Sequence, residues 1–178
     1  KYDHKTACTT PILEEEEIMD ASIMAFNQVL EKKEPYIKHL KELFIKLADT
    51  QDLEKQQDLA RTKHADLIND LRRYMNENTR QIQDQEEYNR RFSEMDARCK
   101  RAEERIAYLD GKMVEQLGQK EQIHRCLKKL EQCGESLAEF DADLWCTMVD
   151  SVTVFADKTL VFRFYGNMKV SVKISENK

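Results

Sequence analysis

A repeating pattern of apolar residues is the strongest structural signal in the sequence. Eight of them follow one another at alternating steps of four and three: Tyr88, Phe92, Met95, Cys99, Ala102, Ile106, Leu109 and Met113. The positions between them are nearly all charged or polar. This spacing corresponds to the a and d positions of a heptad repeat, which line one side of a helix and need a partner helix. The pattern therefore predicts one helix of a coiled coil.

A shorter run with the same spacing precedes this helix and supplies its expected partner. From Gln57 it continues through Ala60, His64, Leu67, Leu71 and Tyr74, with His64 as a tolerated polar position. The stretch between the two runs has no helical period, and Asp84 is suited to cap the returning helix. We therefore expect an antiparallel coiled-coil hairpin over 51–133, with its tip near 76–84.

The segment before the hairpin predicts one or two connecting helices over 12–50. Thr10 is expected to cap the first of them, with Pro11 at the first helical position and acidic residues in the turns that follow. Pro35 should interrupt the helix, because proline removes a backbone hydrogen-bond donor. A second break is expected at 48–52, where the apolar stripe changes phase.

The last segment, 134–178, changes in character and predicts a small α+β foot. Asp141 can cap a short helix, whose Trp145 is expected to anchor a core. Three Val-rich or aromatic runs follow, and they predict a three-stranded antiparallel β-meander. Gly166 suits a two-residue type II′ turn between the last two strands. The expected fold is mostly α with this small foot.

Composition supports long helices and a thin core. Charged residues make up 35% of the 178 residues and aromatic residues 8%, with only four Gly and two Pro. The net charge of −5 argues against an extensive nucleic-acid surface but permits a local basic patch. Five irregularly spaced cysteines indicate no disulfide framework and favour a cytoplasmic protein. No apolar run is long enough to span a membrane, which requires about 18 residues.

No catalytic motif occurs in the sequence, so we assign no catalytic residue and expect no enzymatic activity from this chain. His124, Cys126 and Cys133 include metal-ligating types, but helical residues two apart point about 200° away from each other. We therefore interpret these three as ordinary residues on the surface of a helix. Cys8 would be a zinc ligand only if further cysteines lay upstream of Lys1, and we expect the chain to be part of a longer protein.

Three segments resemble the C-terminal region of the large serine recombinases, the family of serine integrases and transposon recombinases. Cys8-Thr9-Thr10-Pro11-Ile12 and the following EEEEIMDASIMAFNQVL are similar to the end of that family's zinc ribbon and the helix that leaves it. Residues 82–92 are similar to the start of its returning arm, and 140–164 to its closing helix and strands. The earlier ribbon cysteines and the catalytic domain of the family do not occur in this sequence.

The resemblance implies a role in site-specific DNA recombination. The parent protein would cut and rejoin DNA through a covalent serine–DNA linkage, and residues 1–11 would end a truncated zinc ribbon whose zinc belongs to the parent. The hairpin would contact other recombinase subunits through apolar residues near its tip: Tyr74, Met75, Ile82 and Tyr88. Basic residues of the two ends are the candidate DNA contacts: Lys1, Lys5, Lys158, Arg163 and Lys169.

A coiled-coil chaperone or adaptor of prefoldin-like architecture is the alternative interpretation. Such proteins also combine a coiled-coil hairpin with a small β element. This alternative assigns no purpose to Cys8. A chain that oligomerises through its strands and binds unfolded clients would favour it.

Overall fold

The computed structural model describes residues 10–78 and 84–174, and the chain divides into two compact units. One unit combines Lys1–Lys46 with Gln119–Lys178, and the other is Leu47–Gly118. The described elements are five helices and three strands: α1 Glu15–Glu31, α2 Lys33–Ala48, α3 Gln51–Asn78, α4 Gln85–Gln132, α5 Ala142–Met148, β1 Val149–Val154, β2 Thr159–Phe164 and β3 Met168–Lys173. This confirms the mostly α fold with a small α+β foot.

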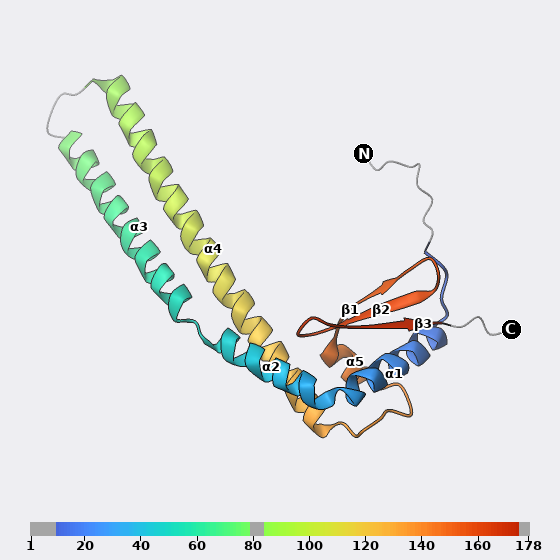
Figure 1. Cartoon of the computed structure of the whole chain (residues 1–178). Helices are drawn as coiled ribbons and strands as arrows, with labels where there is room; N and C mark the ends of the chain where they lie inside the picture. Colours follow the sequence, from blue (N-terminus) through green and yellow to red (C-terminus); the bar gives the residue numbers. More distant parts are fainter. Residues whose placement is uncertain (1–9, 79–83, 175–178) are drawn as a thin grey trace. The chain divides into compact units, whose positions relative to one another are not determined.

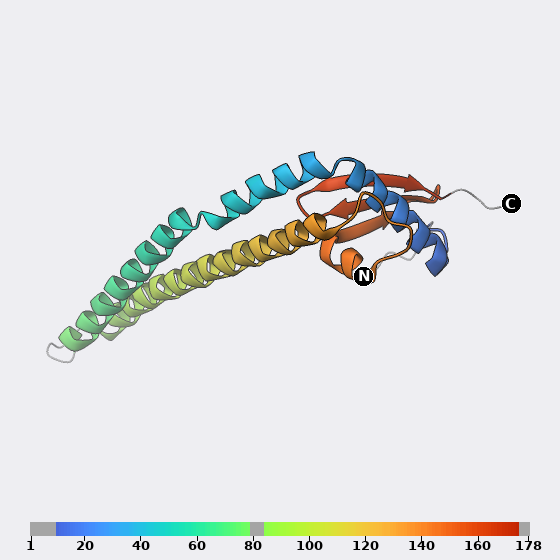
Figure 2. The same ribbon diagram turned by 90° about the horizontal axis from the view of Figure 1, so that it is seen from below.

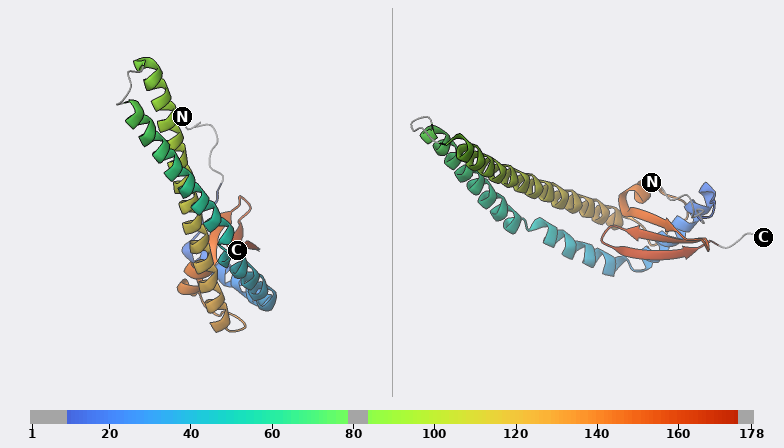
Figure 3. Two further views of the ribbon diagram at one scale, coloured as in Figure 1. Left: turned by 90° about the vertical axis from the view of Figure 1, so that its left-hand side faces the viewer. Right: turned by 90° about the horizontal axis from the view of Figure 1, so that it is seen from above.

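The unit Leu47–Gly118 is a helical hairpin. Its helices, α3 and the first part of α4, run side by side in opposite directions (Figure 1, Figure 3). All eight predicted apolar positions of α4 are buried or half-buried, whereas the residues between them are mostly exposed. Within the described part of the hairpin only Cys99 and Leu109 are almost fully buried, at 3% and 1% exposure. The predicted coiled-coil seam, meaning these a and d positions, therefore exists, and it is thin.

Polar contacts across the hairpin fix the alignment of its two helices. Asp110 Oδ1 accepts hydrogen bonds from Gln57 Nε2 at 2.8 Å and from Arg61 Nη2 at 3.0 Å. One turn further along α3, His64 Nε2 lies 3.3 Å from Glu103 Oε1, without hydrogen-bond geometry. The contact residue on α4 therefore moves toward the start of that helix as the contact residue on α3 moves toward its end. This is the order that an antiparallel pair of helices requires.

Both predicted interruptions before the hairpin are present. α1 ends at Glu31 and α2 begins at Lys33, which places Pro35 in the first turn of α2, where the missing N–H is not needed. α2 ends at Ala48 and α3 begins at Gln51. Across this second break, the side-chain amide of Gln116 donates to the carbonyl oxygens of Leu47 and Asp49, at 3.0 and 2.9 Å.

The predicted start of the first helix is wrong. Thr10 and Pro11 precede α1, which begins at Glu15 with Glu14 as its N-cap. The backbone N–H of Glu14 donates to Glu17 Oε2 at 2.9 Å, so the reciprocal carboxylate of a capping box fixes the helix start here. Three acidic residues in the first turn also favour this start, because they complement the positive end of the helix dipole.

The other unit has a core formed between α1 and the sheet. The strands are ordered β1-β2-β3 and all neighbours are antiparallel, which confirms the predicted meander. α1 packs against β2 and β3 (Figure 2), with the ring of Phe26 edge-on to Phe164 at 5.2 Å. Trp145 of α5 meets Phe162 edge-on at 6.0 Å, as expected of a core anchor, and Asp141 caps α5 as predicted.

The turn between β2 and β3 is also different from its prediction. Phe164 pairs with Met168, so the loop has three residues, Tyr165 to Asn167, instead of a two-residue type II′ turn. Gly166 and Asn167 both have positive φ, at 82° and 65°. The hydroxyl of Tyr36 donates to Tyr165 O at 2.5 Å, and a ring nitrogen of His39 lies 2.9 Å from Gly166 O. Contacts from α2 therefore hold this turn in place.

Replacement of Gly166 by alanine should destabilise the protein by about 1–2 kcal/mol, because the left-handed backbone disfavours a side chain. A Cβ there would also lie 2.6 Å from Leu40 Cδ2. The matched control is Gly111→Ala in α4, where a Cβ meets nothing within 4 Å and should raise stability. Urea denaturation measures both changes, and a Gly166→Ala variant as stable as the parent would contradict this account of the turn.

Cys126 of α4 is fully buried in the core of the unit that contains the sheet, so its expected position on a helix surface is wrong. Its Sγ lies 3.1 Å from Thr147 O, to which the thiol donates. Burial raises the pKa of this thiol from 9.0 to about 11. Burial also raises the pKa of the Tyr36 hydroxyl above its usual 10.0. Both groups are therefore held in their neutral forms by the folded chain.

The free energy of unfolding should fall as pH rises from 9 to 11, because the unfolded chain loses the Cys126 proton at its ordinary pKa and the folded chain keeps it. Cys126→Ala should reduce this fall, whereas Cys146→Ala, at an exposed position, should not. Urea titrations over this pH range measure the effect. An alkaline fall that is the same in both variants would contradict the assignment.

Candidate functional site

The predicted contact residues divide into those near the hairpin tip and those of the sheet. Lys1, Lys5, Cys8 and Ile82 lie outside the described residues. The remaining six are placed by α3, α4, the β1–β2 turn and the strands. They form two separate groups, and each has its own chemistry.

Tyr74 and Tyr88 are packed against each other between the two helices of the hairpin. Their rings stack with centroids 5.3 Å apart, and Tyr88 continues the stack onto Phe92 at 6.1 Å. Both tyrosines are half-buried. The stack engages both tyrosines inside the hairpin, which leaves less of their surface for the expected contact with another subunit. Met75 differs, because it is 44% exposed and belongs to no such stack.

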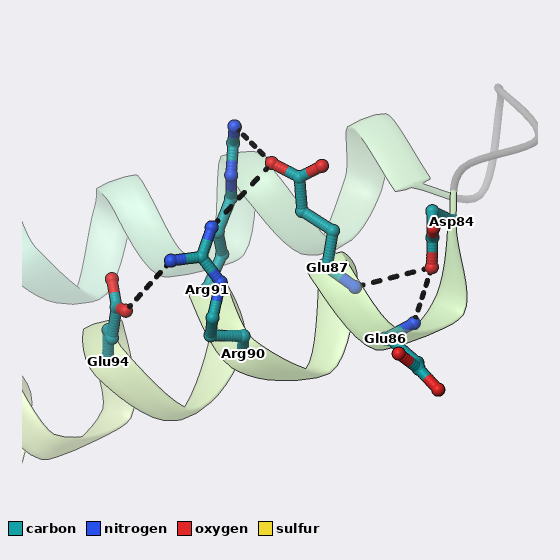
Figure 4. A network of polar contacts seen from close by, with 6 residues as sticks. All are labelled: Asp84, Glu86, Glu87, Arg90, Arg91 and Glu94. Atoms are coloured by element: carbon teal, nitrogen blue, oxygen red, sulfur yellow. Dashed lines mark hydrogen bonds and ion pairs between the residues drawn. The ribbon is translucent and has the colours of Figure 1, made fainter.

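The start of α4 is stabilised by a network of polar contacts (Figure 4). Asp84 Oδ1 accepts from the backbone N–H groups of Glu86 and Glu87, at 2.8 and 3.4 Å, and this is the predicted cap. Glu87 Oε1 lies 2.5 Å from Arg91 Nη2 and 3.9 Å from Arg90 Nη2, and Arg90 also reaches Glu94 at 3.7 Å. These contacts satisfy the first backbone N–H groups of α4 and pair both arginines, and the excess of carboxylates leaves this end of the helix acidic.

The basic residues of the sheet only partly come together. Arg163 and Lys169 are direct neighbours across β2 and β3, and both are exposed. Lys173 is exposed further along the same face of β3, and the sequence analysis did not single it out. Lys158, in the β1–β2 turn, instead pairs with Glu17 of α1 at 3.7 Å. Asp150 pairs with Arg163 at 2.5 Å and partly neutralises this face.

One group of basic residues was missed by the sequence analysis. Lys63 of α3 and Arg98, Arg101 and Arg105 of α4 border a groove on the flank of the hairpin. The three arginines are spaced by three and four residues, so they share one side of α4. The spacing of the arginines could have been identified from the sequence. The groove could not, because it depends on the alignment of α3 and α4.

Metal-ligating residues do not converge in the part of the chain that the structure describes. Cys126 is engaged by Thr147 O, and the ring of His124 lies 5.9 Å from that of Phe44. Burial raises the pKa of Cys133, so its thiolate form is disfavoured as well. Over 10–78 and 84–174, no helix is both long and apolar enough to cross a bilayer.

Comparisons with known proteins found no match to this chain among family models, curated proteins or solved structures. The assignment of function therefore rests on the residues and their geometry.

Substitution of Tyr88 by alanine should loosen the distal part of the hairpin by about 1–2 kcal/mol, because the stack on Tyr74 and Phe92 is lost. Hydrogen exchange of the amides at the end of α3 and the start of α4 measures the change. Val114→Ala, at a position that is 71% exposed, is the control and should leave this exchange unaltered. Equal exchange in the two variants would show that the stack does not hold the helices together.

Proposed function

We propose that this chain is the C-terminal part of a site-specific serine DNA recombinase, in which the hairpin contacts other subunits and the α/β unit belongs to the DNA-binding module. The observation that carries the proposal is the organisation of the chain. Leu47–Gly118 folds as a unit of its own, although the residues on both sides of it in sequence share one core. A long coiled-coil hairpin inserted into a small domain is what the resemblance to serine recombinases implies.

The surface of the hairpin supports a role in reversible protein contact. Its seam buries little, and several large apolar side chains are exposed: Leu59, Met75, Tyr108, Val114 and Leu117. Exposed apolar groups on a polar helical surface often mark contact sites. Met75 lies in the last described turns of α3, next to the predicted tip.

The outer face of the sheet supports a minor share in DNA binding. Arg163, Lys169 and Lys173 are exposed there, and basic residues of this kind contact phosphates without reading sequence. Asp150 weakens the field of Arg163, so the main DNA contacts belong to the rest of the parent's module. In this proposal zinc is held in the parent by Cys8 with cysteines upstream, the catalytic serine is also upstream, and the parent acts in the cytoplasm on DNA.

Replacement of Met75 and Ile82 by glutamate should abolish self-association of the chain, because two charges would enter an apolar contact between arms. The fold should be retained, since Met75 is exposed at 44%. Sedimentation velocity over a range of concentrations measures the association, and circular dichroism checks the helix content. Val114→Glu is the matched control, because it places a charge on an exposed apolar position far from the tip.

The proposal predicts that the parent chain and Val114→Glu associate and that the double variant remains monomeric. A double variant that associates as well as the parent chain would contradict a contact through the tip. A DNA-mobility assay with the same proteins should show no difference among them, since the substituted residues lie in the hairpin.

A further inference from the structure

A groove on the side of the hairpin has an apolar floor and is bordered by basic side chains. Its volume is about 310 Å³, and it lies between two turns of α3 and two turns of α4. Three apolar residues that the seam leaves half-buried form the floor: Ala60, Leu67 and Ala102. Four exposed basic residues form the walls: Lys63, Arg98, Arg101 and Arg105.

The hollow arises from the size of the seam residues at this level. Ala60 and Ala102 both occupy a or d positions of the seam, whereas other seam positions carry larger side chains, such as Leu71 and Ile106. Two small residues in facing helices leave space that a larger side chain would fill. The apolar floor is therefore accessible from the flank.

The basic residues of the walls lack acidic partners. In the described part of the chain, no carboxylate forms an ion pair with Lys63, Arg98 or Arg101, and Arg105 donates only to the amide oxygen of Gln56, at 3.1 Å. Several other basic residues of α4 are paired with carboxylates, as Lys100 is with Asp96 at 2.7 Å. Like charges one turn apart on a helix destabilise it. The groove thus concentrates unpaired positive charge in a chain whose net charge is −5.

We propose that this groove binds an acidic, amphipathic segment of a partner protein. Carboxylates of the segment would pair with Arg98 and Arg101, whose guanidinium groups can donate hydrogen bonds to both oxygens of a carboxylate. An apolar side chain of the segment would fill the floor between Ala60 and Ala102. A DNA backbone fits less well, because phosphates and sugars offer no aliphatic side chain for this floor. The inference does not depend on the recombinase proposal, since it uses only the charges and shape of the hairpin.

The test uses the full chain and a fluorescein-labelled helical peptide of Leu and Glu, with Leu on one face and Glu on both flanks. A scrambled peptide of the same composition is the first control. Arg98→Gln combined with Arg101→Gln should weaken peptide binding about tenfold or more, since it removes charge-assisted hydrogen bonds. Ala102→Leu should weaken it as well, because it fills the floor and leaves every charge in place. Arg72→Gln is the matched control, an exposed α3 arginine outside the groove.

The expected result is binding by the parent chain and by Arg72→Gln, with preference for the amphipathic peptide over the scrambled one. Absence of binding by the parent chain would overturn the proposal. Equal binding of the scrambled peptide would overturn it too, because the floor would then contribute nothing. Binding of a short DNA duplex that is lost in the Arg98/Arg101 variant, with no loss in Ala102→Leu, would show a phosphate surface instead.

Discussion

The burial of apolar surface between α1, α2, the end of α4 and the three-stranded sheet is the interaction on which the structure depends. Phe26 packs on Phe164 across the core, and these residues come from opposite sides of the hairpin in the sequence. Hydrogen bonds follow the same arrangement: the Asn27 side chain bonds both backbone groups of Leu137, and Lys33 Nζ donates to Cys133 O at 2.7 Å. The two segments that form this core, Lys1–Lys46 and Gln119–Lys178, contact each other directly, and Leu47–Gly118 connects them. A long insertion between two such segments adds little loop-closure entropy.

The two units differ in the source of their stability. The α/β unit buries large side chains completely, among them Phe162, Phe164 and Leu130, whereas the hairpin relies on a single line of partly exposed residues. A thin seam gives little stability for its length, because helix stability in proteins comes mainly from packing. Polar contacts such as Asp110 with Gln57 and Arg61 then matter for alignment. The hairpin is therefore the less firmly packed of the two units.

Much of the fold was predictable from the sequence, because it follows from the spacing of apolar residues and from residues that cap helices. The seam from Tyr88 to Met113, the interruption near Pro35, the Asp84 and Asp141 caps and the β-meander all rest on local signals. The predictions that failed concern a helix start and a turn, where side-chain contacts that the sequence pattern does not show determine the local structure. α1 begins at Glu15 and not near Thr10, because the Glu17 carboxylate accepts from the backbone N–H of Glu14. The turn between β2 and β3 has three residues and not two, and Tyr36 and His39 contact it. The groove could not be predicted, since it requires knowing how the helix that carries Ala60 and the helix that carries Ala102 are aligned in the hairpin.

The nucleotide sequence upstream of the codon for Lys1 tests the central functional claim most directly. The recombinase proposal predicts a Cys-x-x-Cys shortly before Lys1, which would complete a zinc site with Cys8, and a serine recombinase catalytic domain further upstream. A start codon immediately before Lys1 would contradict it, because Cys8 would then have no partner ligands and the chain no catalytic domain.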